Sequence, residues 1–159
     1  MGLRFPSQKN ANCFFITTTF KGWLKLGEID GFYQALIDNI IFYLKKYNAA
    51  LAGYVLMPDH IHFIIFINGD KLSAFMRDFK KYVSQKIVKD YKINESRIWF
   101  PRYDRVAIFS EEIMRTKLEN IHNNPVKRGL VRKAIDWEWS SARDYSGGKV
   151  GKIQIWKKW

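Results

Sequence analysis

The chain has 159 residues, of which 47% are hydrophobic and 16% aromatic, so it can fold as one domain around a sizeable core. Its 27 Lys and Arg residues against 15 Asp and Glu residues give a formal net charge of +12, which favours a polyanionic partner, most simply a nucleic acid. Since no apolar run reaches spanning length and no isolated amphipathic basic helix is present, a membrane partner is disfavoured.

The cysteine content and the first residues bear on location. The single cysteine, Cys13, excludes an internal disulfide and indicates a reducing compartment. Residues 1–6 contain no apolar segment of the kind found in signal peptides, so we expect a cytoplasmic protein. No repeat or linker divides the chain, which predicts one domain over residues 1–159, with a core over about 12–145 and a basic, tryptophan-containing tail.

The first half of the chain alternates strand and helix patterns. Residues 12–20 are dense in β-branched and aromatic side chains, which indicates a strand. Residues 29–47 carry apolar side chains at helical spacing and predict a long amphipathic helix. Residues 49–57 and 60–67 predict two further strands with a bend between them.

The second half predicts two more helices around an extended segment. Residues 71–91 carry one apolar stripe and predict a helix, and residues 98–109 predict an extended segment or strand interrupted by Pro101. Ser110 is a good helix cap because its hydroxyl can accept a hydrogen bond from a free backbone N–H group. Pro125 disfavours helical geometry in the residue before it, so we expect this last helix to end at about Asn123.

The order of these elements is strand, helix, strand, strand, helix, strand, helix. Such an order suggests an antiparallel sheet with helices packed on one face. The sequence therefore predicts an α+β fold with a ferredoxin-like layout.

Two histidines stand out in the strand pattern over residues 60–67. Because strand side chains alternate, His60 and His62 point to one face while Ile61 and Phe63 point to the other. The plainer interpretation is a pair of half-exposed histidines at a sheet edge. The matched spacing, together with His122 in a second unusual stretch, favours a metal or phosphate site.

Residues 57–62 (MPDHIH) resemble the HUH motif (His, hydrophobic, His) of the single-tyrosine transposases, and the Met-Pro before the histidines is most similar to the REP-associated tyrosine transposase branch. Residues 119–131 (ENIHNNPVKRGLV) resemble that branch's Tyr-Ile-x-x-Asn-Pro-Val-Lys/Arg-x-Gly block, and residues 140–145 (SSARDY) its closing segment. The resemblance covers most of the chain. It implies a ferredoxin-like fold and single-stranded or hairpin DNA as the partner, and we expect a monomer or homodimer.

The resemblance also implies a metal site. In the family, the two HUH histidines and a polar residue of the last helix hold a divalent metal, magnesium or manganese, which polarises a scissile phosphate. Carried over to this chain, the ligands are His60, His62 and Asn124, with His122 and Asn123 as rivals for the third place. Imidazoles alone favour zinc or another transition metal, so magnesium or manganese is implied by the resemblance only.

The family nucleophile has no direct counterpart in this chain. The family's tyrosine attacks the phosphate and leaves a 5′-phosphotyrosyl link, whereas the matching position here is Asn120, whose amide cannot form a stable phosphoester. Tyr82 is the best substitute, although an aromatic residue at the edge of the core is its plainer interpretation. Tyr91 and Tyr103 are weaker candidates.

Several cations are candidates for contacts to DNA. Some share one side of the second helix, which suits a solvated surface or a phosphate track equally, some flank Tyr103, and some form a basic turn after the last helix. The candidates are Arg77, Lys80, Lys81, Arg102, Arg105, Lys127 and Arg128.

The sequence leaves open whether the chain is an enzyme. One hypothesis is a transposase-like single-strand DNA endonuclease, which the intact histidine pair favours. The other is a relative that binds DNA hairpins and has lost strand cleavage, which Asn120 favours. An RNA-binding ferredoxin-like domain is a weaker third hypothesis, because no strand carries the aromatic pattern of that class.

Overall fold

The structure is a computed structural model that describes residues 10–95 and 97–159. The expectation that the chain has no signal peptide rests on residues 1–6, which lie outside the described residues. Within the described ranges, no helix is long and apolar enough to cross a membrane.

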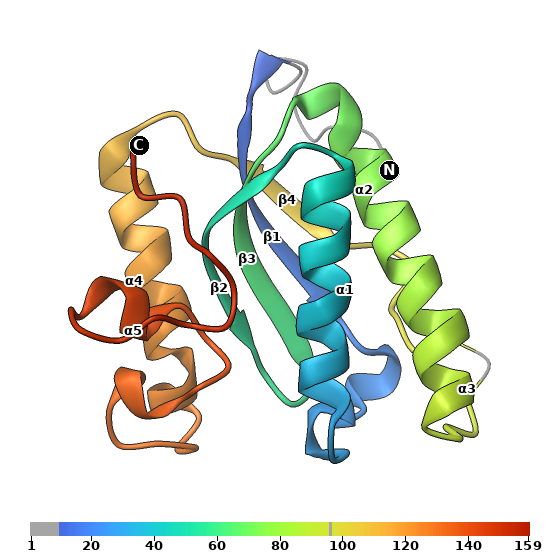
Figure 1. The fold of residues 1–159 in the computed structure, drawn as a ribbon. Coiled ribbons are helices and arrows are strands. Elements are labelled where there is room, and N and C mark those ends of the chain that lie inside the picture. The colour runs from blue at the N-terminus through green and yellow to red at the C-terminus, as the bar shows by residue number, and fades with distance from the viewer. Residues whose placement is uncertain (1–9, 96) are drawn as a thin grey trace.

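A four-stranded antiparallel sheet forms the centre of the molecule (Figure 1). Across the sheet the strands follow the order β2 (Ala50–Leu56), β3 (His60–Phe66), β1 (Cys13–Thr19) and β4 (Asp104–Ala107). One helix connects β1 to β2 and another connects β3 to β4, while a tight turn at Pro58 and Asp59 joins β2 to β3. This connectivity is the ferredoxin-like α+β layout that the sequence predicts.

The two connecting helices cover the same face of the sheet (Figure 1). They are α1 (Phe32–Lys46) and α2 (Gly69–Tyr82), and α2 continues through a π-helical turn over Val83–Ile87 into α3 (Val88–Asp90). Ile61 and Phe63 of β3 pack against these helices in the larger of two apolar cores. The odd-numbered positions of β3 therefore belong to the α1–α2 face.

The third long helix, α4 (Glu111–Lys127), packs on the opposite face, against β2 and β3. Its residues Met114, Leu118 and Ile121 bury Cys13 and Ile64 in a second apolar core. The expectation that helices cover one face is therefore wrong for α4. Helical spacing gives α4 an apolar stripe without saying which sheet face receives it, and β2 is apolar on both faces.

The two ends of α4 answer two separate expectations. Its start is as predicted, because Ser110 Oγ accepts a hydrogen bond from the Ile113 N–H. Its end is not, because the helix passes through Pro125 and continues to Lys127. Proline removes one backbone donor, yet the final turn still closes through a bond from the Arg128 N–H to the Asn124 carbonyl. Asn124 consequently stays on the helix.

The C-terminal segment lines the free edge of β2. The Leu56 N–H donates to the Trp139 carbonyl, and the Trp156 N–H donates to the Leu51 carbonyl. Trp137 adds a bond from its indole Nε1–H to the Leu56 carbonyl. The tail, which includes the short helix α5 (Ala142–Tyr145), covers an edge that would otherwise be open to another strand.

The close approach of α4 to β2 depends on Gly53. A Cβ atom at this position would lie 2.5 Å from Leu118 Cδ2 and 3.2 Å from Ser141 Oγ. We predict that Gly53→Ala lowers the free energy of unfolding by about 1–3 kcal/mol, measured by urea denaturation, because the extra carbon overpacks this contact. Cys13 should also react faster with a thiol reagent, since it is buried under α4 and burial raises its pKa to about 12.

The matched control is Leu118→Val, alone and combined with Gly53→Ala. If the contact is the cause, the double variant is more stable than the sum of the two single effects predicts. Additive losses, or wild-type labelling of Cys13 in Gly53→Ala, would contradict this account of how α4 docks.

Candidate metal centre on the histidine strand

His60 and His62 project from the sheet face that α4 covers. On the neighbouring strand β1 they stand opposite Thr19 and Thr17, respectively. Their ring centroids are 4.6 Å apart and the two planes are steeply inclined to each other. The structure therefore brings the two imidazoles together on one face, as strand alternation predicts.

A buried carboxylate orients His60. The His60 Nδ1–H donates to Asp59 Oδ1 at 2.7 Å, and the Arg128 guanidinium donates to Asp59 Oδ2 at 3.0 Å. Burial alone would raise the pKa of Asp59, but the hydrogen bonds from Arg128 and His60 outweigh burial and lower it. Asp59 therefore stays ionised and fixes the tautomer that leaves His60 Nε2 as an acceptor.

His62 is held from the other side. Thr17 Oγ1 lies 2.9 Å from His62 Nδ1, and the Phe15 ring stacks on the imidazole with centroids 5.3 Å apart. Burial lowers the pKa of His62 to about 4, and electrostatic interactions with His60 and Lys117 act in the same direction. The imidazole is therefore neutral at physiological pH, which is the form that binds a metal.

The third group comes from α4. Asn124 Nδ2 donates to His60 Nε2 at 3.2 Å, so the amide occupies the position from which a ligand would join the histidines. This contact depends on the helix continuing past Pro125, because Asn124 then keeps its helical orientation. An amide can present either oxygen or nitrogen by rotating about its terminal bond, so its oxygen can serve as a metal ligand.

These side chains fit a divalent metal. Each imidazole has its Nδ1 engaged by a side chain, which leaves Nε2 for coordination, and Asn124 supplies a neutral third donor. No group of three or more His, Cys, Asp or Glu side chains suited to a metal occurs in residues 10–95 and 97–159. Two imidazoles and an amide leave coordination positions open for phosphate and water.

His122, the rival ligand, lies elsewhere. Its Nε2 is 2.8 Å from Ser141 Oγ, and its ring packs 5.4 Å from the ring of Tyr145. These contacts place His122 between α4 and the C-terminal segment rather than beside His60. The structure does not bring it to the histidine pair. Asn123 is exposed on α4.

Asn120 lies on the helix face that borders the histidines. Lys117 reaches the ring of Phe15, which stacks on His62, at 4.8 Å, and Asn124 contacts His60. Asn120 comes three residues after Lys117 and four residues before Asn124, so its side chain lies on the same face of α4 as theirs. Its side chain is exposed. The position that matches the family tyrosine is therefore open to solvent, one turn from Asn124.

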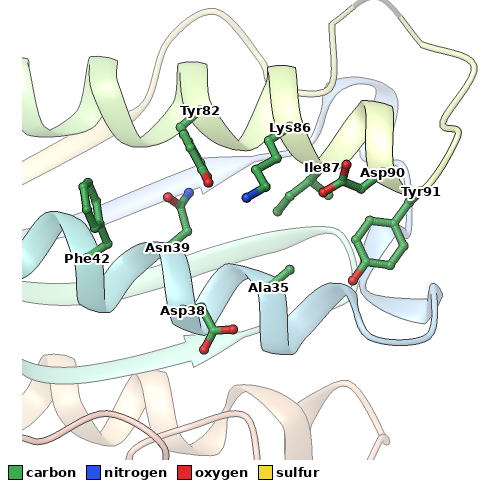
Figure 2. A pocket seen from close by; sticks show the side chains of 9 residues that line it. All are labelled: Ala35, Asp38, Asn39, Phe42, Tyr82, Lys86, Ile87, Asp90 and Tyr91. Atoms are coloured by element: carbon green, nitrogen blue, oxygen red, sulfur yellow. The ribbon is translucent and has the colours of Figure 1, made fainter.

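Two of the proposed substitute nucleophiles, Tyr82 and Tyr91, are not at this site. Tyr82 stands on α2, on the other side of the sheet, where its ring contacts Tyr43 and faces Asn39 of α1 (Figure 2). Tyr91 donates its hydroxyl hydrogen to the Gly31 carbonyl. The helix period put Tyr82 at the edge of the core but could not show which face of the sheet its helix covers.

Four of the residues predicted to contact DNA lie on the α1–α2 side as well, among them Lys80, which is described below. Arg77 and Lys81 are exposed on α2, and Arg77 pairs with its neighbour Asp78. Arg105 is buried on β4 and donates to Ser73 Oγ of α2, so its side chain is engaged within the protein. Arg105 is next in the chain to Asp104, and strand alternation turns the two side chains to opposite faces.

Lys80 serves a structural contact. Its Nζ donates to the Phe100 carbonyl and lies 5.8 Å from the centroid of the Trp99 ring. Burial lowers the pKa of Lys80 to about 8. This lysine anchors the segment before β4 instead of offering a free cation to DNA. Arg128 is likewise engaged with Asp59, whereas Lys127 is exposed.

A hollow of about 500 Å³ adjoins the histidines across β1. Its floor includes Thr17 and Thr19, which share the sheet face of His62 and His60. Its rim includes Arg102, Phe100 and Trp23, of which Trp23 is 60% exposed. Trp23 also has a φ of 56°, a conformation that a tryptophan rarely adopts. An exposed aromatic ring held at this cost beside a cation suits base stacking.

Sequence reasoning missed four residues of the histidine site and the adjoining hollow: Thr17, Trp23, Asp59 and Lys117. Asp59 could have been found, because a carboxylate next to a metal-binding histidine is a common orienting partner. Strand alternation can assign Thr17 to one face of β1, but it cannot show that His62 is the residue opposite it. Trp23 and Lys117 reach the site through tertiary contacts that no local pattern reveals.

The chain is similar in sequence to known proteins. A REP-associated tyrosine transposase of Escherichia coli (strain K12) is 29% identical over 119 residues, which cover 73% of this chain and 68% of that protein. A relative from Haemophilus influenzae is 29% identical over 107 residues, or 61% of each protein.

A solved structure described as a REP-associated tyrosine transposase bound to a REP hairpin has the same fold. Its TM-score is 0.70 at 24% identity, and the match covers 92% of this chain and 94% of that chain. The family described as "Transposase IS200 like" matches residues 25–124, a range that includes both histidines, Asn120 and Asn124. The chain therefore belongs to the IS200-like transposase family.

Proposed function

We propose that this protein binds single-stranded DNA next to a hairpin, with a divalent metal held at His60, His62 and Asn124. The observation that carries the proposal is the meeting of two oriented imidazoles with an amide from α4 on one sheet face. The relatives' names and the hairpin in the solved structure support DNA as the partner. We propose that the protein acts in the cytoplasm, where it can bind DNA. It acts there as a monomer or homodimer.

The metal we propose is magnesium or manganese. It would supply positive charge to a scissile phosphate and so make the phosphorus more electrophilic. Asp59 and Thr17 orient the imidazoles from behind, and Arg128 keeps Asp59 ionised. Open coordination positions can accept a phosphate oxygen without loss of a protein ligand.

The single strand would leave the metal site along β1 toward Trp23. The indole offers a stacking surface for a base, and Arg102 offers a charged partner for the backbone. Lys127 and Lys117 extend the positive charge along α4. The strand would thus be held on both sides of the histidines.

Strand cleavage is the step that the chain lacks a group for. The family reaction joins a tyrosine oxygen to phosphorus while the 3′-hydroxyl leaves, and an asparagine amide cannot replace that oxygen. Since Asn120 takes the tyrosine's position and Tyr82 lies across the sheet, we propose a hairpin-binding relative without phosphotyrosine chemistry. The active transposase is the alternative, which the complete metal ligand set favours.

Binding to a hairpin with a single-stranded flank should be tighter than binding to an unrelated duplex of equal length. Affinity should fall steeply with added salt, because each neutralised phosphate releases a counterion. Trp23→Ala should weaken hairpin binding by about 1–3 kcal/mol through lost base stacking, measured by fluorescence anisotropy.

Phe109→Ala is the matched control, since Phe109 is 68% exposed and does not line the hollow beside the histidines. This change should leave affinity at the wild-type value. Equal affinity for duplex and hairpin, or equal effects of the two substitutions, would count against the proposed path of the strand.

Asp59→Asn should weaken manganese binding about 10- to 100-fold in a calorimetric titration. The amide accepts a weaker hydrogen bond from His60 than the carboxylate does, and it no longer balances Arg128. Asp104→Asn is the control, because Asp104 is an exposed carboxylate on the same sheet face. Similar metal affinity in both variants would exclude Asp59 as the orienting group.

Asn120→Tyr should create a covalent adduct with a labelled hairpin strand in the presence of manganese, visible on a denaturing gel. The wild-type protein and Asn120→Phe should bind the same strand without an adduct, since both lack the phenol oxygen. The yield is expected to be low because catalytic geometry tolerates little misplacement. An adduct formed by the wild-type protein and lost in Tyr82→Phe would overturn the assignment of Asn120.

A further inference from the structure

A cavity of about 360 Å³ lies between α1 and α2, on the sheet face opposite the histidines (Figure 2). Asn39 and Phe42 line it from α1, and Tyr82, Lys86 and Ile87 line it from the second helix. The metal centre makes no use of these residues. The cavity therefore needs a separate explanation.

Asn39 is the unusual residue in this cavity. Its side chain is only 5% exposed, yet neither its amide oxygen nor its amide nitrogen has a hydrogen-bond partner among the described residues. Figure 2 shows the amide directed across the cavity toward Tyr82. A buried amide without partners destabilises the fold, so a leucine here would suit packing better. The arrangement is that of a polar group kept for a ligand.

The second helix changes its geometry at the cavity. Val83–Ile87 form a π-helical turn directly after Tyr82, and Lys86 and Ile87 of that turn line the cavity. Such turns insert one residue into a helix and occur often at functional sites. The Lys86 ammonium lies 5.5 Å from the centroid of the Tyr82 ring. The π-helical turn and the unpartnered amide are independent observations on one cavity.

We propose that this cavity binds an unpaired adenine base. An asparagine amide matches the N6 donor and N7 acceptor of adenine with two parallel hydrogen bonds. Tyr82 and Phe42, which are 38% and 61% exposed, offer aromatic surfaces for stacking, and Lys86 can donate to a ring nitrogen or to the attached sugar-phosphate. Asp38 and Asp90 also border the cavity and disfavour the deep entry of a phosphate, so the base is the part that enters.

Two sources of adenine share this chemistry, a free nucleotide and a base in a DNA strand. The experiment titrates the full chain with adenosine 5′-monophosphate, and separately with a DNA hairpin that carries one unpaired adenine or an abasic residue at the same place. Asn39→Leu should lower affinity about 10-fold for the nucleotide if the source is free, or for the adenine hairpin alone if the source is DNA.

The melting temperature of the same variant separates a ligand-binding asparagine from a purely structural one. Asn39→Leu should raise the melting temperature by about 3 °C, because it removes a buried amide without partners. Lys45→Leu, an exposed polar-to-leucine change on the same helix at a position that does not line the cavity, should alter neither affinity nor melting temperature. Gain of stability together with loss of adenine binding supports the proposal.

Three results would overturn the proposal: no binding of either probe, binding unchanged by Asn39→Leu, or a lower melting temperature for that variant. Concentration-dependent dimerisation that Asn39→Leu abolishes would also overturn it, by making a second copy the occupant. Because the cavity and the histidines lie on opposite sheet faces, these results leave the metal-centre assignment untouched. His60→Ala should keep adenine binding and lose metal binding.

Discussion

The ion pair between Asp59 and Arg128 ties the metal centre together. Asp59 lies in the turn before β3 with its side chain 8% exposed, and a buried carboxylate without a partner would be costly. Arg128 reaches it from the residue directly after α4, 69 positions later in the chain. The pair holds the end of α4 against the start of β3, and the same carboxylate orients His60. Docking of the helix and preparation of the ligand are thus one interaction.

The ferredoxin-like core was within reach of sequence reasoning because strand and helix periods differ and each core element carries one of these periods. The side-by-side histidines followed from alternation alone. The face covered by α4 did not follow, since β2 is buried on both sides and accepts a helix on either one. The passage of α4 through Pro125 was missed because the rule against helical geometry before proline is a preference, which packing can override.

The site residues divide along the same line. His60, His62 and Asn124 were implied as ligands by the family resemblance, and the structure brings them together. Arg105 and Tyr82 were chosen as exposed or flanking residues, but their sheet face depends on strand pairing and helix placement that the sequence does not encode locally. Whether a basic residue meets DNA or a neighbouring side chain is a tertiary property, as the engagement of Lys80 with the Phe100 carbonyl illustrates.

The two faces of the sheet differ in how their buried polar side chains are hydrogen-bonded. On the α4 face, both histidines have side-chain hydrogen-bond partners, which hold them in place as ligands. On the α1–α2 face, Asn39 has none among the described residues, and its burial lowers stability without a visible structural return. A fold that satisfies one polar site and leaves another unsatisfied is under different constraints at the two places. Oriented ligands serve a metal, whereas an unpartnered amide beside aromatic rings serves a ligand that brings its own donor and acceptor.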